Sequence, residues 1–87
     1  MSTTAIVEKL KAYVVETFLY DREDVVLTAD LALFEERIID SMGIFRLVTF
    51  MNEAFEIVIQ PDEIVLENFG TIADMTRLVA EHLPKGS

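Results

Sequence analysis

The sequence contains no cysteine, and this absence already excludes several kinds of chemistry. Without thiols the chain can form no disulfide, no thiolate metal site and no cysteine nucleophile, which is consistent with a reducing compartment. Tryptophan is also absent, and three glycines with two prolines are too few for a low-complexity chain. Any thiol chemistry in which the protein takes part would therefore come from a cofactor.

Basic residues are scarce as well. Seven Lys and Arg stand against 16 Asp and Glu, so the formal net charge is −9. This balance argues against nucleic acid or an anionic membrane as the partner, and it favours enzymes with basic docking patches. Taken alone, an acidic composition is more often only a solubility feature.

Long apolar runs are missing too. The N-terminal residues "MSTTAIVEKL" lack the basic start and the apolar stretch of a signal peptide. No apolar run is long enough to span a bilayer. We therefore expect a cytoplasmic protein that does not enter the membrane.

The residues that are present indicate one small folded domain. The 87 residues are 52% hydrophobic, which suits a packed core but not a large enclosed active site. We expect residues 1–87 to form a single monomeric domain, with residues 84–87 as a disordered tail.

Apolar spacing predicts three main helices. The first carries a stripe from Val7 to Phe18 and has Thr3 or Thr4 as its cap. The second starts at Asp40 or Ser41 and ends near Glu56, and the last follows Thr71, which begins a capping-box pattern. The predicted core of the later helices consists of Ile44, Leu47, Val48, Met51, Phe55, Ile64, Ile72 and Leu78.

The segments between these helices are less regular. Residues 19–40 have no helical period, so we expect a long loop held to the core by Val25, Leu27, Leu31, Phe34 and Ile38, with a helical turn near 33–37. Pro61 begins a short third helix or two helical turns, and Gly70 ends this segment. The segments "DVVLT" and "EIVIQ" also suit strands, but they are too isolated to build a sheet. The predicted fold is all-α, a small antiparallel four-helix bundle.

Four features follow one another along the chain: Asp40-Ser41-Met42 after the long acidic loop, the apolar helix from Ile44 to Met51, Ala54-Phe55-Glu56, and Pro61-Asp62-Glu63 at the start of the short helix. Their order resembles that of the acyl carrier and peptidyl carrier protein family. The similarity covers most of the chain.

The resemblance implies a covalent cofactor on Ser41. A phosphopantetheinyl transferase would attach 4′-phosphopantetheine from coenzyme A to this residue, with Asp40 as part of what the transferase recognises and with Met42 and Gly43 beside the site. The arm ends in a thiol, which would carry an acyl or aminoacyl group as a thioester. The implied function is that of a freestanding carrier in a specialised fatty-acid, polyketide or nonribosomal-peptide pathway, loaded by an adenylating enzyme or a synthase.

The local chemistry agrees with this implication. With Asp40 as the cap, Ser41 is the first helical residue, where free N–H groups and the helix dipole favour a phosphate. Gly43 would leave a gap through which the transferase or the arm approaches. A serine at a helix start is ordinarily only a cap, so the surrounding pattern decides in favour of modification.

One side of the second helix is a candidate docking surface. Met42, Phe45, Thr49 and Glu53 lie away from the apolar stripe, although Phe45 could instead tuck into the core. Arg46 departs from the strongly acidic second helix of fatty-acid carriers, so it either selects partners of a dedicated carrier or is a neutral surface residue. The alternative function is a small acidic helical interaction module without a cofactor.

Catalysis and metal binding are not expected. The only histidine, His82, falls at the end of the last helix, where we expect it to be solvated, and a G-x-S-x-G motif is absent. The loop acids lack the ligand spacing of an EF-hand; they are Asp21, Glu23, Asp24 and Asp30.

Overall fold

The computed structural model describes residues 2–83, and over this range the chain is helical without any strand. The helices are α1 (Thr3–Phe18), α2 (Ser41–Phe55), α3 (Leu66–Phe69) and α4 (Ile72–His82), with a 3₁₀ turn, η1 (Pro61–Glu63), before α3. The predicted all-α class is confirmed for this range, and neither "DVVLT" nor "EIVIQ" forms a strand. The expected tail at residues 84–87 lies outside the described residues.

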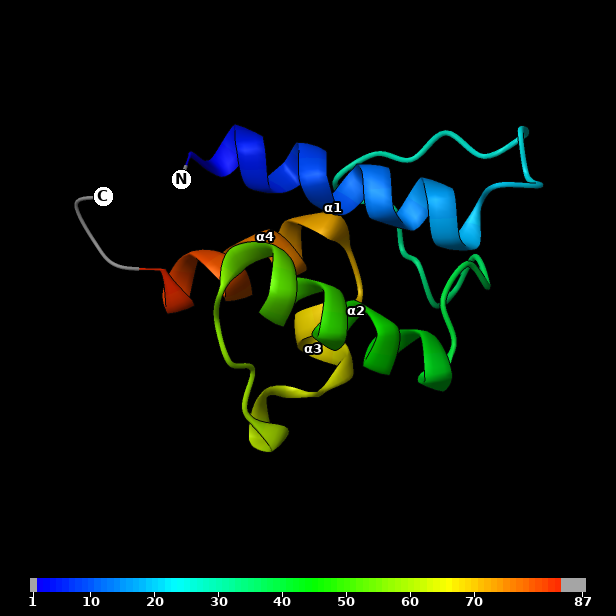
Figure 1. Ribbon diagram of the computed structural model, residues 1–87. Coiled ribbons are helices and arrows are strands. Elements are labelled where there is room, and N and C mark those ends of the chain that lie inside the picture. Colours follow the sequence, from blue (N-terminus) through cyan, green and yellow to red (C-terminus); the bar gives the residue numbers. More distant parts are fainter. Residues whose placement is uncertain (1, 84–87) are drawn as a thin grey trace.

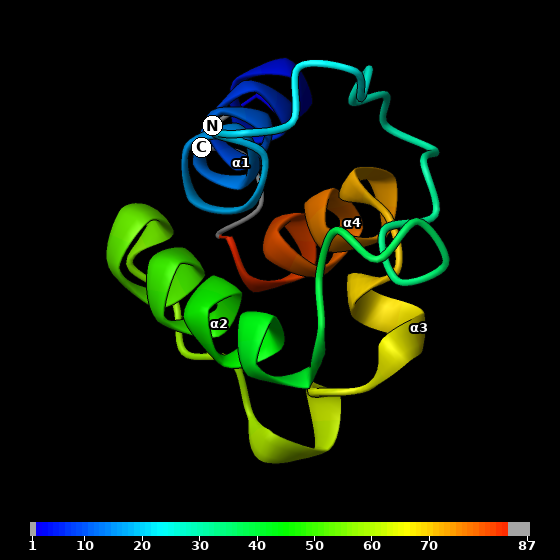
Figure 2. The ribbon, with the colours of Figure 1, turned by 90° about the vertical axis from the view of Figure 1, so that its right-hand side faces the viewer.

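The helices pack around a shared core. α1 and α2 run in opposite directions, and α4 packs against α1 (Figure 1). The segment 19–40 leaves the end of α1, passes the side of the molecule that carries α4 and α3, and returns to the start of α2 (Figure 2). This path brings loop residues next to the first turn of α2.

The core is formed mainly by the predicted apolar stripes. Six of the eight predicted core residues are buried, while Val48 and Ile64 are partly buried against the core. After α2 the chain is extended, and its side chains alternate: Ile57 and Ile59 are buried while Val58 between them is exposed. The six buried predictions are Ile44, Leu47, Met51, Phe55, Ile72 and Leu78.

The helix caps were predicted with mixed success. Thr71 is the cap of α4, and its hydroxyl accepts the N–H of Asp74 at 3.0 Å, as predicted. The prediction of Thr3 or Thr4 as the cap of α1 is wrong, because Ser2 holds that position and accepts the N–H of Ala5 at 3.2 Å. Several adjacent hydroxyl residues can all cap, so the local sequence does not choose among them.

The loop between α1 and α2 is anchored at several points. Ile38 is buried and the other four predicted anchors are partly buried against the core, which confirms that prediction. The backbone adds two ties, since Leu33 donates to the carbonyl of Gly70 and Ala73 donates to that of Ala29, each at 2.9 Å. These hydrogen bonds join the loop to the junction between α3 and α4.

A helical turn is present in this loop where it was predicted. The N–H of Ile38 reaches the carbonyl of Leu33 at 2.9 Å, and that of Arg37 reaches Phe34 at 3.1 Å. Arg37 has a φ of 58°, so this is a Schellman ending with an arginine at the left-handed position. The turn fixes the backbone from which the Arg37 side chain leaves.

Candidate functional site

Ser41 is the first residue of α2 and is exposed to solvent. Asp40 before it has extended backbone, and its Oδ1 accepts the N–H of Gly43 at 2.9 Å. The carbonyl of Asp40 accepts the N–H of Ile44 at 3.2 Å, the first hydrogen bond of the helix. Asp40 is thus the cap, as predicted, and the Ser41 hydroxyl is not needed for that purpose.

The electrostatic setting of Ser41 suits an attached phosphate. Asp40 satisfies the N–H of Gly43, while the N–H groups of Ser41 and Met42 have no acceptor within the helix. The first turn of α2 contains no acidic residue, and the positive end of the helix dipole lies there. A phosphate ester of Ser41 fits these donors, which is the general chemistry of anions at helix starts.

At Gly43, the place that a Cβ would take is already filled by neighbouring side chains. It is buried, and a Cβ built on it would lie 2.9 Å from Cγ2 of Ile39 and 3.0 Å from the ring of Phe18. The glycine therefore lets the first turn of α2 pack closely onto these two side chains. Its role in the helix is in packing; Gly43 also lines the pocket at the start of α2, and its role in giving access beside Ser41 stays a prediction.

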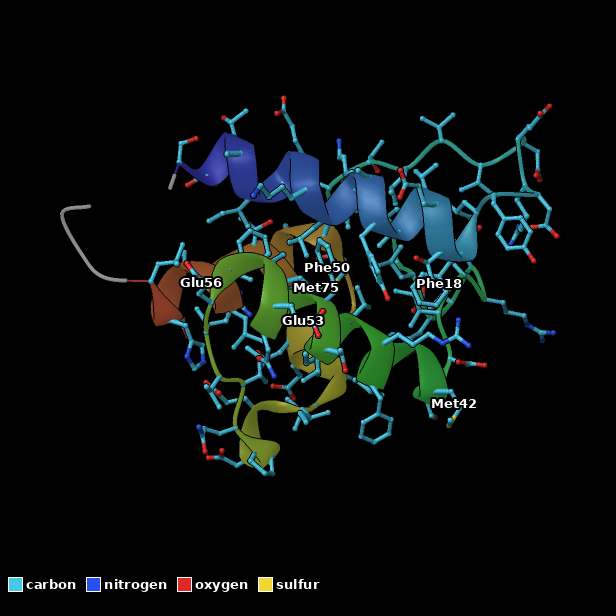
Figure 3. All side chains as sticks on the ribbon, in the orientation of Figure 1. Phe18, Met42, Phe50, Glu53, Glu56 and Met75 are labelled. Atoms are coloured by element: carbon cyan, nitrogen blue, oxygen red, sulfur yellow. The ribbon has the colours of Figure 1, made fainter. Side chains whose placement is uncertain are left out.

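A pocket of about 270 Å³ lies against the start of α2. Both sequence neighbours of Ser41 line it, although Ser41 itself is not part of the lining, and Figure 3 shows Phe18 and Met42 at this same end of the molecule. Three of its residues, Phe18, Arg37 and Ile38, were not among the predicted site residues. The complete lining is Phe18, Arg37, Ile38, Asp40, Met42, Gly43 and Arg46.

The candidate docking residues all lie on the outer side of α2. Met42 is 70% exposed and Phe45 58% exposed, so the alternative in which Phe45 enters the core is excluded. Arg46, Thr49 and Glu53 are also exposed. Figure 3 shows Met42 at the start of α2 and Glu53 farther along it. The five residues form a continuous exposed face, whose docking role remains a prediction.

Arg46 lies where α1 and α2 meet. Its carbonyl accepts the hydroxyl of Tyr13 at 3.3 Å, and the Tyr13 ring stacks on Phe50 with 4.2 Å between centroids. Arg46 lines both the pocket beside Ser41 and a second hollow that contains Tyr13 and Phe50. Arg46 therefore contributes to two neighbouring pockets and, through its carbonyl, to the contact between α1 and α2.

His82 is not solvated as predicted. Its side chain is 21% exposed, and Nε2 lies 2.9 Å from both carboxylate oxygens of Glu63. The backbone N–H of Gln60 donates to the same carboxylate at 2.8 Å. This hydrogen bond is the main cause that lowers the pKa of Glu63. Desolvation raises the pKa, and the contact with His82 lowers it further. The end of α4 and the start of α2 lie at opposite ends of the molecule, so His82 does not face Ser41 (Figure 1).

The described residues were also compared with the requirements of a metal site and of a membrane-spanning helix. Among residues 2–83, no three His, Cys, Asp or Glu side chains gather in a way that could hold a metal ion. In the same part of the chain, no helix combines the length and apolar character needed to cross a membrane.

Comparisons with known proteins add no assignment. The chain matches none of the protein-family models and none of the curated proteins compared with it. The residue geometry around Ser41 and the pattern of the sequence are therefore what supports a function.

Proposed function

We propose that this protein is a carrier of the acyl or peptidyl carrier class, folded as a small antiparallel four-helix bundle and modified with 4′-phosphopantetheine on Ser41. One observation carries the proposal. The Ser41 hydroxyl is exposed at the first position of α2 while Asp40 already supplies the cap, so the hydroxyl is available for chemistry at a helix start that favours phosphate.

The chain's own contribution to the modification is the exposed hydroxyl oxygen of Ser41. In the transfer, a bond forms between Oγ of Ser41 and the phosphorus nearer the pantetheine in coenzyme A. The pyrophosphate bond breaks, adenosine 3′,5′-bisphosphate leaves, and the hydroxyl proton passes to a base of the transferase. The bound arm supplies a thiol, which the cysteine-free chain lacks, and that thiol holds an acyl or aminoacyl group as a thioester.

The exposed side of α2 supports a role in partner contact. Met42 and Phe45 are large apolar side chains left in water close to Ser41, and residues of that kind mark interaction sites more often when they lie together. The net charge of −9 favours partners with basic surfaces, and Arg46 places one opposite charge within the contact area. The proposed partners are a phosphopantetheinyl transferase and an adenylating enzyme or synthase that loads the thiol.

Loading with coenzyme A tests the proposal. The folded chain is incubated with coenzyme A and a broad-specificity phosphopantetheinyl transferase, and the intact mass is measured. We expect the wild type to gain one phosphopantetheine group and Ser41→Ala to gain none. Ser2→Ala is the matched control, because Ser2 also stands at a helix start, and it should load like the wild type. A wild type that gains no mass, or a Ser41→Ala chain that gains it, contradicts the proposal.

A second candidate is a small acidic interaction module without a cofactor. The exposure of Met42 and Phe45 is the observation that favours it. The two candidates differ in the loading experiment, since a module of this kind gains no mass with any transferase. They share the expectation that Phe45→Ser weakens partner binding, so that variant alone does not separate them.

A further inference from the structure

The pocket beside Ser41 is basic, although the protein as a whole is acidic. Arg37 and Arg46 both line it, in a chain that has only seven Lys and Arg residues and a net charge of −9. The one carboxylate in the lining belongs to Asp40, and its Oδ1 is occupied by the N–H of Gly43. The pocket therefore offers positive charge at the one place where the proposed modification adds a negative one.

Neither arginine is engaged by an acidic side chain in the described part of the chain. The ion pairs between residues 2 and 83 join Arg77 to Asp74 and His82 to Glu63. Arg22, another loop arginine, is directed to the backbone carbonyl of Glu36 at 3.5 Å. The guanidinium groups of Arg37 and Arg46 thus keep their N–H donors for a ligand.

The two arginines are held by separate elements that meet at this pocket. Arg37 follows the hydrogen-bonded turn of the loop, and Arg46 lies on α2, where its carbonyl is tied to Tyr13 of α1. Phe18, Ile38 and Met42 are the large apolar residues of the pocket lining. The volume of about 270 Å³ is several times the ~30 Å³ of one liquid water, so it accepts a group larger than an isolated ion.

We propose that this pocket holds the base of the arm attached to Ser41. The guanidinium groups of Arg37 and Arg46 donate to the phosphodiester oxygens, and Phe18 contacts the dimethyl carbons that follow the phosphate. Arginine suits this task because its planar fork binds phosphate with paired, charge-assisted hydrogen bonds. The inference rests on the proposed function. Beyond that function, it states that the first part of the arm lies against α1 and the loop 19–40 and is held there.

Phosphorus NMR on the loaded protein tests this placement. Intact mass first establishes that each sample carries the arm. The ³¹P shift of the wild type should differ from that of the same loaded chain unfolded in urea, and Arg37→Gln/Arg46→Gln should move it more than halfway to the unfolded value. Arg22→Gln/Arg77→Gln removes the same charge elsewhere and should leave the shift as in the wild type.

A second NMR measurement uses only the wild type, so it remains possible if the double variant does not fold. The side-chain Nε–Hε signals of Arg37 and Arg46 should move on loading, while that of Arg77 should not. Fully loaded protein in which neither these signals nor the ³¹P shift respond overturns the inference and leaves the proposed function standing. Slower loading with an unchanged ³¹P shift also overturns it, because the arginines would then serve the transferase. A wild type that takes no arm is recognised by its mass and overturns both.

Discussion

Asp40 and Ser41 are neighbours in the chain but have different roles at the start of α2. The Asp40 carboxylate accepts the N–H of Gly43 at 2.9 Å, while Ser41 is exposed. A serine that also capped the helix would lose this hydrogen bond on modification. Because the cap belongs to Asp40, a group attached to the Ser41 hydroxyl does not remove the capping hydrogen bond.

This division of roles predicts different stabilities for two alanine variants. Asp40→Ala should lower the free energy of unfolding by about 1 kcal/mol, because it removes the cap of α2. Ser41→Ala should change it by less than about 0.5 kcal/mol, as expected of an exposed site. Urea unfolding followed by circular dichroism measures both. An equal loss in the two variants would contradict the assignment of the cap to Asp40.

Gly43 should resist the substitution that helix propensity favours. Alanine is better than glycine in a helix by about 1 kcal/mol, but its Cβ would lie 2.9 Å from Ile39 and 3.0 Å from Phe18. Ile39 is 3% exposed, and its Cγ2 is bonded to a branched Cβ with stiff χ1, so we expect the overpacking to outweigh the propensity gain. We expect Gly43→Ala to lower the free energy of unfolding by roughly 1 kcal/mol. Thr49→Ala, an exposed site in the same helix, is the control, and a stabilising Gly43→Ala would refute the packing role.

At the scale of the element, α2 ends on a residue in an unfavourable conformation. Glu56 has a φ of 54°, and its N–H donates to the carbonyl of Asn52. Glycine adopts this left-handed conformation without the Cβ penalty. Glu56→Gly should therefore raise the free energy of unfolding by about 0.5–1 kcal/mol, whereas Glu56→Gln, which removes only the charge, should leave it unchanged. Thermal and urea unfolding give the comparison, and a destabilised glycine variant would count against it.

The turn η1 is tied to the end of α4 through Glu63, and this tie is sensitive to acid. The N–H of Gln60 and the ring of His82 both face the Glu63 carboxylate, and they hold its pKa below the ordinary value. A lowered folded-state pKa means that the carboxylate stabilises the fold above its ordinary pKa of about 4.3 and stops doing so as the pH falls through the folded value.

We therefore expect Glu63→Ala to lower the free energy of unfolding by about 1 kcal/mol at neutral pH. The difference from the wild type should shrink as the pH falls below the ordinary carboxyl pKa and passes through the lowered folded-state pKa. Urea unfolding over a series of pH values measures this, with Glu67→Ala, an exposed acid of α3, as the control. A difference that stays constant down to the lowest pH would show that the carboxylate charge is not involved.

The helices could be predicted from sequence because their signals are local. The apolar period and the Asp40 cap place α2 within a residue of its observed bounds, Ser41–Phe55, and Thr71 marks the start of α4. For the loop 19–40, only its anchors and the turn near 33–37 were predicted, since its burial has no period. Leu33 and Ile39 are among its most buried residues, yet nothing in their spacing sets them apart from exposed neighbours.

At the scale of the whole molecule, the surroundings of Ser41 come from distant parts of the chain. Ser41 and its cap were predictable because they adjoin in sequence, whereas Phe18 and Arg37 reach the same pocket only through the path of the loop. The pairing of His82 with Glu63 is likewise a long-range contact across 19 positions. Such contacts depend on how the elements pack, and a reading of local patterns does not contain that information.

The net charge of the protein and the charge of the pocket lining have opposite effects on a phosphate attached to Ser41. A net charge of −9 keeps an acidic surface toward partners, and it repels a phosphate that is attached to the chain. Arg37 and Arg46 beside Ser41 offset this repulsion at one point, in the setting proposed for the arm. The acidic protein and its basic pocket are thus consistent with a single carrier function.

The most direct test of the central claim is to locate the added group within the loaded chain. After incubation with coenzyme A and a phosphopantetheinyl transferase, the protein is digested and its peptides are fragmented in a mass spectrometer. The account predicts one phosphopantetheine group, on the peptide that contains residue 41 and on Ser41 itself. An unmodified Ser41 in fully treated, folded protein, or the group on any other residue, would contradict it.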